Sequence, residues 1–195
     1  MLASASPRRA DLLREFGYSF EVIPADITEI AYPYLSPVEL TSWNAFRKAR
    51  RVAAAFPQAV VIGADTVVSL GAQVFGKPGT PAAAKAMLSV LSGRTHTVTT
   101  AYCLVYARQR RFYLDHAQTA VTLKVLSESE IDAYHAVIDP LDKAGAYAAQ
   151  TAPERVIAKI EGLHSNVIGL PVEALERPLI GLRVARGLRG HERSR

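Results

Sequence analysis

The residues best suited to chemistry begin at the fourth position, in the run Ser4-Ala5-Ser6-Pro7-Arg8-Arg9. A serine followed by proline is typical of a helix start, so the pattern predicts a helix from Ser6 to about Phe16. Two arginines in its first turn are unfavourable unless an anion binds, because a helix N-terminus already carries partial positive charge. With two hydroxyls and unpaired backbone N–H groups beside them, they favour a phosphate site. The alternative is a pair of solvated surface arginines.

A single carboxylate, Asp65, follows the apolar run Val60-Val61-Ile62 and the small residues Gly63-Ala64. This order predicts a buried strand that ends in a small-residue turn and presents Asp65 at its end. Enzymes that process phosphates often place a magnesium-binding aspartate in this way. The alternative is an aspartate that caps a turn. The pattern G-x-x-x-x-G-K-[ST] is absent, which excludes a phosphate-binding loop of that type.

Other candidates are weaker when taken one at a time. Lys77 lies between a predicted strand and a predicted helix, and Lys48 lies within a long predicted helix. Either ammonium group would neutralise phosphate charge, although most lone lysines are simply solvated. Glu29 is equally open. Gln150 ends the run from Leu141, and its amide suits a pyrimidine edge or a ribose, the alternative being a structural turn.

Several other chemistries are excluded. The patterns G-x-S-x-G, H-E-x-x-H and C-x-x-C do not occur, and the five histidines show no metal-ligand spacing. The single cysteine, Cys103, rules out an intramolecular disulfide and is predicted to be a small core residue.

Capping residues and apolar runs predict the elements that must position these candidates. Helices are expected over residues 6–16, 36–55, 80–93 and 127–137. Strands are expected over 59–62, 67–70, 73–75, 95–106, 118–125, 156–160 and 166–168. This alternation indicates an α/β or α+β domain with a mixed sheet.

Composition suggests one domain over residues 1–176 followed by an arginine-rich tail over 177–195. The tail holds six of the 23 basic and one of the 18 acidic residues, so the net charge of +5 belongs to it and the body is neutral. A neutral body does not favour nucleic-acid binding. We interpret the tail as solvated, the alternative being a tail attracted to phosphates or membranes. No apolar run reaches the length of a membrane span, and no signal peptide is recognised, so a soluble cytoplasmic protein is expected.

Six segments in the same order produce a specific likeness to one family. From near Leu2 to about Leu175, the sequence resembles the Maf family of nucleoside triphosphate pyrophosphatases. The matching segments are residues 2–9, 63–68, 76–78, 91–100, 142–147 and 166–171.

The resemblance implies an elongated α/β fold with a mixed, twisted sheet and a central cleft, similar to inosine triphosphate pyrophosphatases. It implies that Asp65 is the catalytic base and a ligand of Mg²⁺ or Mn²⁺, with Glu29 as a second metal ligand. It further implies that a set of polar and basic residues lines the phosphate and metal site: Ser6, Arg9, Lys48 and Lys77, the last with a catalytic role.

The family branch that prefers dTTP and UTP carries residues matching Arg8, Thr66 and Gln150. The implied reaction is hydrolysis of a nucleoside triphosphate to a monophosphate and pyrophosphate. Two alternatives stay open: a preference for purine or modified nucleotides, and a nucleotide-binding regulator of septum formation with little turnover. The implied partner is a small-molecule nucleotide, with neither nucleic acid nor membrane, and the family suggests a homodimer. Residues 148–153 replace a stretch that is usually glycine-rich in the family.

Overall fold

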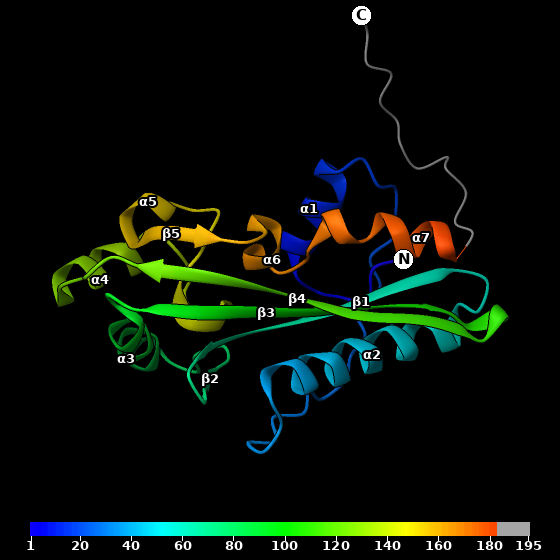
Figure 1. Cartoon of the computed structure of the whole chain (residues 1–195), viewed down its shortest axis with the longest axis horizontal. Helices are drawn as coiled ribbons and strands as arrows, with labels where there is room; N and C mark the ends of the chain where they lie inside the picture. Colours follow the sequence, from blue (N-terminus) through cyan, green and yellow to red (C-terminus); the bar gives the residue numbers. More distant parts are fainter. Residues whose placement is uncertain (183–195) are drawn as a thin grey trace, which may run out of the picture. The chain divides into compact units, whose positions relative to one another are not determined.

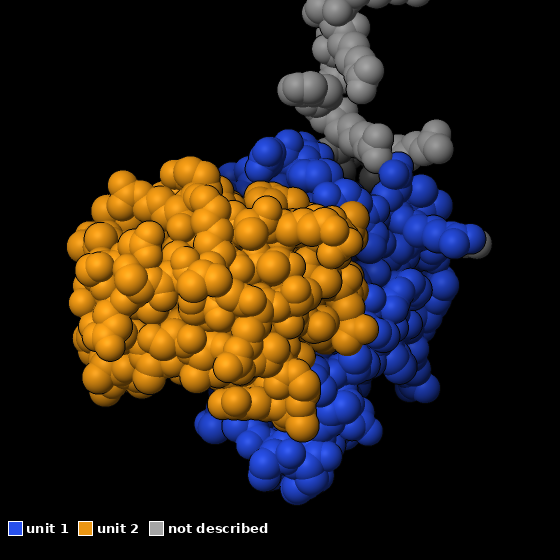
Figure 2. Space-filling view, turned by 60° about the vertical axis from the view of Figure 1, so that its left-hand side comes forward, with its two compact units in different colours: residues 1–65, 101–116, 169–195 blue, residues 66–100, 117–168 orange. Residues whose placement is uncertain are grey.

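The computed structural model describes residues 1–182, and its chain falls into two compact units, coloured blue and orange in Figure 2. Unit 1 contains residues 1–65, 101–116 and the part from Gly169 onward, and unit 2 contains residues 66–100 and 117–168. The arginine-rich residues 183–195 lie outside the described chain. Residues 177–182, placed in the tail from sequence, include most of a final helix, in which Leu179 is buried.

Within residues 1–182 the strands form one sheet in the order β2-β1-β3-β4-β5. β1 pairs antiparallel with β2, and β4 with β5, whereas Leu2 forms single parallel bridges to Val22 and Ile62. The predicted α/β class is therefore confirmed. The five-stranded sheet itself is antiparallel, and the parallel pairing expected of a mixed sheet is seen at the single bridges of Leu2. The strands are β1 (Val60–Leu70), β2 (Gln73–Phe75), β3 (Thr95–Tyr106), β4 (Arg111–Leu123) and β5 (Ile157–Glu161).

Local capping patterns placed the longer helices correctly. The capping boxes at Ser36 and Ser127 both form, each with its serine and the glutamate three residues later bonded reciprocally. Thr80 caps the third helix. The helices of the described chain are α1 (Pro7–Glu15), α2 (Pro37–Ala55), α3 (Pro81–Leu91), α4 (Glu128–His135), α5 (Pro153–Val156), α6 (His164–Ile168) and α7 (Glu176–Gly181).

In unit 1, α2 packs against the strands through small side chains. Ala45 and Ala49 of α2 join Val61 of β1 and Cys103 of β3 in one buried cluster, which confirms that Cys103 is a core residue. Figure 1 shows α2 on one face of these strands, with α1 and α7 on the other. Gly63 allows the close approach, because a Cβ there would lie 2.4 Å from the carbonyl oxygen of Ala45.

The prediction that Asp65 ends a strand is wrong. β1 continues from Val60 to Leu70, so Asp65 lies in the middle of a continuous strand. The small residues Gly63 and Ala64 were interpreted as a turn. They instead leave room for α2, a tertiary cause that is not visible in the local sequence.

Unit 2 has its own core, in which Val68 of β1, Leu88 of α3, Val121 of β4 and Tyr134 of α4 are buried together. Two predicted strands need correction. β4 begins at Arg111 instead of residue 118, and residues 166–168 belong to the short helix α6. In α6 the amide of Asn166 is buried and donates to the carbonyl of Val98 and the hydroxyl of Thr119, long-range contacts that the local sequence pattern did not predict.

Among the residues from Met1 to Leu182, no helix combines the length and apolar character needed to cross a membrane.

Candidate active site

A buried ammonium group forms the centre of the charged site in unit 1. Nζ of Lys48 lies 2.8 Å from Oδ1 of Asp65 and 2.6 Å from Oε1 of Glu29. It also donates to the carbonyl of Ala64 at 3.3 Å. Three predicted site residues from a helix, a strand and a loop therefore meet at one point.

Burial makes this cluster electrostatically strong. The side chains of Lys48 and Asp65 are 10% and 9% exposed, whereas that of Glu29 is 54% exposed. Charge interactions increase as water is excluded, so the pair of Lys48 and Asp65 interacts more strongly than a surface pair would. Glu29, which faces solvent, provides the open side of the cluster.

Arg9 lies deeper in unit 1 than the sequence pattern suggested. Its Nε donates to the carbonyl of Gly169 at 2.8 Å. Its Nη1 donates to Oγ of Ser4 at 3.0 Å and to the carbonyl of Ala64 at 2.9 Å. Arg9 thus fixes the start of α1 against β1 and the segment at Gly169.

The electrostatic environment of Arg9 links it to the two carboxylates. Burial lowers the pKa of its guanidinium, and the negative charges of Asp65 and Glu29 act in the opposite direction. Arginine stays protonated despite such burial. Unit 1 therefore holds two cations, Arg9 and Lys48, close to two carboxylates.

The start of α1 differs in detail from the prediction. Ser6 occupies the N-cap position, but its hydroxyl makes no capping hydrogen bond. Instead, the backbone N–H of Ser6 donates to Oγ of Ser4. Arg8 is half-buried and Arg9 is buried, so the two arginines differ in their surroundings although they are adjacent.

Unit 2 contains the remaining predicted residues. Thr66 is half-buried, and its hydroxyl lies 2.9 Å from that of Thr100. Lys77 and Gln150 are exposed. The carbonyl of Gly76 accepts a hydrogen bond from the N–H of Gly145, so the segment that carries Lys77 is tied to the turn that precedes Gln150.

Buried hydrogen bonds anchor the loop that carries Gln150. The hydroxyl of Tyr134 donates to the carbonyl of Ala148 at 3.2 Å and accepts from the N–H of Ala148 at 3.0 Å. A ring nitrogen of His164 lies 3.2 Å from the carbonyl oxygen of Ala149. The backbone next to Gln150 is therefore fixed while its side chain is exposed.

Comparisons with known proteins identify the family of this chain. The family model described as "Maf-like protein" matches residues 1–182. The chain belongs to this family. It is 47% identical over 179 residues to a dTTP/UTP pyrophosphatase of Moorella thermoacetica, covering 92% of each chain. A dTTP/UTP pyrophosphatase of Syntrophus aciditrophicus is 42% identical, covering 92% of this chain and 87% of the relative. The resemblance inferred from six motifs is thus confirmed.

Two contacts within the charged cluster of unit 1 were not predicted from the sequence. Ser4 lies inside a matched motif, yet only the structure shows that it binds Arg9. Asn44 was not considered, although its Nδ2 donates to Oδ2 of Asp65 at 3.0 Å. Its position was a usable sign, because Asn44 and Lys48 are four residues apart and therefore share one face of α2.

Unit 1 also contains a cavity with a mainly apolar lining. It measures about 340 Å³ and is lined chiefly by apolar and aromatic side chains, among them Met1, Leu13, Phe20, Leu179 and Leu182. None of the predicted site residues lines it. The charged cluster around Lys48, and not this cavity, is the candidate active site.

Proposed function

We propose that this Maf-like protein hydrolyses nucleoside triphosphates, with dTTP and UTP preferred, to the monophosphate and pyrophosphate. One observation supports the reaction above all: Lys48 brings Asp65 and Glu29 together in a chain whose relatives are named dTTP/UTP pyrophosphatases. Converging carboxylates beside buried cations are the groups that phosphoryl chemistry requires.

In the proposed reaction, Asp65 acts as the general base. Oδ1 accepts from Lys48 and Oδ2 accepts from Asn44, which leaves further lone pairs on both oxygens for a water proton. The water oxygen forms a bond to the α-phosphorus as the bond from that phosphorus to the bridging oxygen breaks. The proton passes to Asp65, and pyrophosphate leaves with the electron pair of the broken bond.

The donor set fits a divalent cation, which we propose to be Mg²⁺ or Mn²⁺. Glu29 and Asp65 converge on a single cation, the ammonium of Lys48. Magnesium is commonly held by one or two carboxylates together with substrate phosphates. The described chain has no group of three or more His, Cys, Asp or Glu side chains that would hold a metal without substrate. When bound, the ion would polarise the phosphate and acidify water.

The remaining residues of the proposal bind the nucleotide. Lys48, Lys77 and the positive end of α1 would stabilise phosphate charge, together with Ser6, Arg8 and Arg9. Thr66 and Gln150 would contribute to pyrimidine preference through neutral hydrogen bonds. The anchored backbone beside Gln150 supports this role, because a fixed loop discriminates between bases better than a mobile one.

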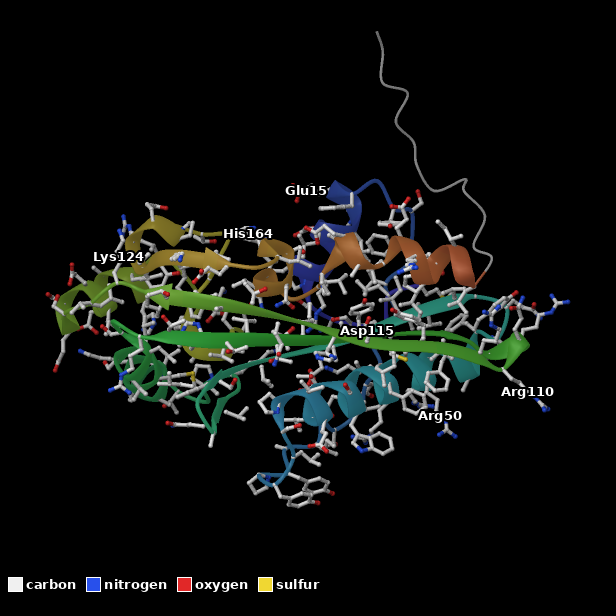
Figure 3. The ribbon with its side chains drawn as sticks, viewed as in Figure 1. Glu15, Arg50, Arg110, Asp115, Lys124 and His164 are labelled. Atoms are coloured by element: carbon white, nitrogen blue, oxygen red, sulfur yellow. The ribbon has the colours of Figure 1, made fainter. Side chains whose placement is uncertain are left out.

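The test is pyrophosphate release from dTTP, UTP, CTP, purine and 7-methyl-GTP substrates with Mg²⁺ or Mn²⁺. We expect turnover of dTTP and UTP, and a fall of roughly 10³-fold or more in Asp65→Asn, since the variant loses its base and a metal ligand. Glu15→Gln is the matched control, because Glu15 is exposed at the end of α1 (Figure 3). Near-normal activity in folded Asp65→Asn would reject the assigned base. Binding without release from any substrate would favour the regulatory alternative.

We also propose a cytoplasmic homodimer. Exposed aromatic side chains of unit 1 supply apolar surface for a second copy: Tyr34, Trp43 and Phe112 are 76%, 52% and 60% exposed. Light scattering coupled to size exclusion tests the dimer, and a monomer at micromolar concentration would reject it.

A further inference from the structure

The buried amide of Asn44 uses both of its N–H groups and its oxygen in hydrogen bonds. Its side chain is on α2, and the residue is 2% exposed. Oδ1 accepts from the N–H of Ile30 at 2.9 Å, and Nδ2 donates to the carbonyl of Ile30 at 3.1 Å. The second hydrogen of Nδ2 is directed to Oδ2 of Asp65, 3.0 Å away. These partners also fix the orientation of the amide, because a carboxylate needs a donor and a backbone N–H needs an acceptor.

The backbone that Asn44 holds is next to the second carboxylate of the site. Residues 28–30 belong to no helix or strand, so side chains must hold them in place. Arg47 of α2 donates to the carbonyl of Thr28 at 2.9 Å, and Lys48 pairs with Glu29. Side chains of α2 therefore bind three consecutive residues of this loop. Among these three side chains, Asn44 is the one with hydrogen bonds both to the loop backbone and to Asp65.

We propose that Asn44 is a positioning residue that sets the separation and orientation of the Glu29 and Asp65 carboxylates. The inference rests on the proposed function, since these carboxylates matter as a pair only if they act on one metal and one substrate. A neutral amide suits this task. It satisfies both backbone groups of Ile30 and still donates to Asp65, without the extra charge that would pair with either carboxylate.

A purely structural role predicts a different result from a positioning role. If Asn44 only fills the space between α2 and the loop, its replacement lowers stability and leaves the affinity for metal unchanged in the folded protein. If Asn44 positions the carboxylates, replacement weakens metal binding and slows the chemical step. Outer hydrogen-bond partners of metal ligands typically contribute 10- to 100-fold to metal affinity or activity.

The main variant is Asn44→Leu, which keeps the approximate size of the side chain and removes every hydrogen bond of the amide. Thr41→Val is the matched control, because Thr41 is also buried on α2 but bonds to the carbonyls of Pro37 and Val38 in its own helix. Both variants replace a buried polar side chain on the same helix by an apolar one. Only Asn44→Leu disturbs Ile30 and Asp65.

Two measurements decide the inference: Mn²⁺ binding by calorimetry to protein saturated with the non-hydrolysable α,β-methylene analogue of dTTP, and steady-state hydrolysis of dTTP. For Asn44→Leu we expect Mn²⁺ affinity to fall by about 10-fold or more and kcat by about 10- to 100-fold. KM for dTTP should stay within about threefold, because the phosphate-binding cations remain. Thr41→Val should stay within about twofold in all three quantities. A folded Asn44→Leu that matches Thr41→Val in Mn²⁺ affinity and kcat would overturn the positioning role.

Asn44→Asp covers the case in which Asn44→Leu does not fold. It keeps the side-chain shape and an acceptor for Ile30 but places a second carboxylate against Asp65, so kcat should again fall by at least about 10-fold. Wild-type kcat in this variant would overturn the inference. If the wild type hydrolyses no nucleotide, the proposed function fails, and the Mn²⁺ comparison alone still decides the role of Asn44. Absence of Mn²⁺ binding in the wild type would overturn the inference together with the metal site.

Discussion

Units 1 and 2 bury polar side chains of different kinds. In the described chain, the charged residues that are buried, Arg9, Lys48 and Asp65, all belong to unit 1. Unit 2 buries neutral groups instead, among them His96, Thr100, Thr119 and Asn166. A buried charge is costly unless opposite charges and hydrogen bonds compensate it, whereas a buried neutral group needs only a hydrogen-bond partner.

The difference fits the division of roles in the proposed function, with phosphate chemistry assigned to unit 1 and base preference to unit 2. In unit 1, carboxylates and cations compensate one another's burial. Reactions on phosphate groups use charged side chains that are held in place and shielded from water in this way. In unit 2 the hydroxyl of Thr66 contacts Thr100, whose hydroxyl in turn donates to the carbonyl of Asn166. Such a chain of neutral groups fixes side-chain orientation without adding charge, as recognition of an uncharged base requires.

Replacing Arg9 should give the largest effect on stability. Arg9→Met leaves the carbonyls of Ala64 and Gly169 without this donor and removes a cation from beside Asp65 and Glu29. Removing one partner of a buried charge cluster typically costs about 3–5 kcal/mol. Urea denaturation at pH 7 measures the loss in the free energy of unfolding.

Arg14→Met is the control for Arg9→Met. Arg14 is on the same helix but exposed, where it pairs with Asp11. Its replacement should change stability by about 0.5 kcal/mol or less. Equal effects of the two variants would show that burial does not increase the cost of removing the charge of Arg9.

The corresponding test in unit 2 uses pH, because His96 is buried in its neutral form. Burial lowers the pKa of His96 from 6.5 to about 4, and a ring nitrogen lies 2.8 Å from the hydroxyl of Tyr147. Between these two pH values the unfolded chain binds a proton that the folded chain does not. The contribution of neutral His96 to the free energy of unfolding is therefore fully present above pH 6.5. It is lost as the pH falls towards 4, and the total loss is about 3 kcal/mol.

Urea denaturation of the wild type and of His96→Leu between pH 7 and pH 4 isolates this contribution. The variant loses the bond to Tyr147 at every pH, but it keeps the other titrating groups of the protein. The stability difference between the two proteins should shrink as the pH falls. A difference that stays constant from pH 7 to pH 4 would mean that His96 is not held neutral.

Local patterns predicted more of the fold than of the site geometry. The capping boxes at Ser36 and Ser127 were predictable because their partners lie within one turn of the chain. The position of Asp65 within β1 was not, because the small residues before it accommodate a helix that is distant in sequence. Asn44 was missed for the same reason: its partners, Ile30 and Asp65, are 14 and 21 residues away.

The family resemblance supplied what local patterns could not. Glu29 and Lys48 had no distinguishing pattern, and matching them to family positions nominated a pair that the structure brings into contact. It did not foresee that Arg9 would be enclosed by backbone carbonyls. Burial of a charged side chain such as that of Arg9 depends on the packing of several elements, whereas burial of the apolar run around Cys103 was predictable from its composition.

The smallest expected effect concerns backbone strain in the loop of unit 2 that follows Gln150. Ala152 has φ of 46°, in the left-handed region that favours glycine, and it lies in the stretch where the family is usually glycine-rich. Ala152→Gly should raise the free energy of unfolding by about 0.5–1 kcal/mol, because relief of strain exceeds the entropy that glycine adds to the unfolded chain. Thermal or urea denaturation measures the change.

Ala133→Gly is the control of opposite sign, because Ala133 lies inside α4, where glycine costs about 1 kcal/mol. A gain at position 152 with a loss at position 133 would show that the neutral hydrogen bonds of unit 2 hold Ala152 in a conformation that alanine disfavours. Loss at both positions would mean that the loop is relaxed. In that case Tyr134 and His164 stabilise the backbone beside Gln150 without having to overcome strain at Ala152.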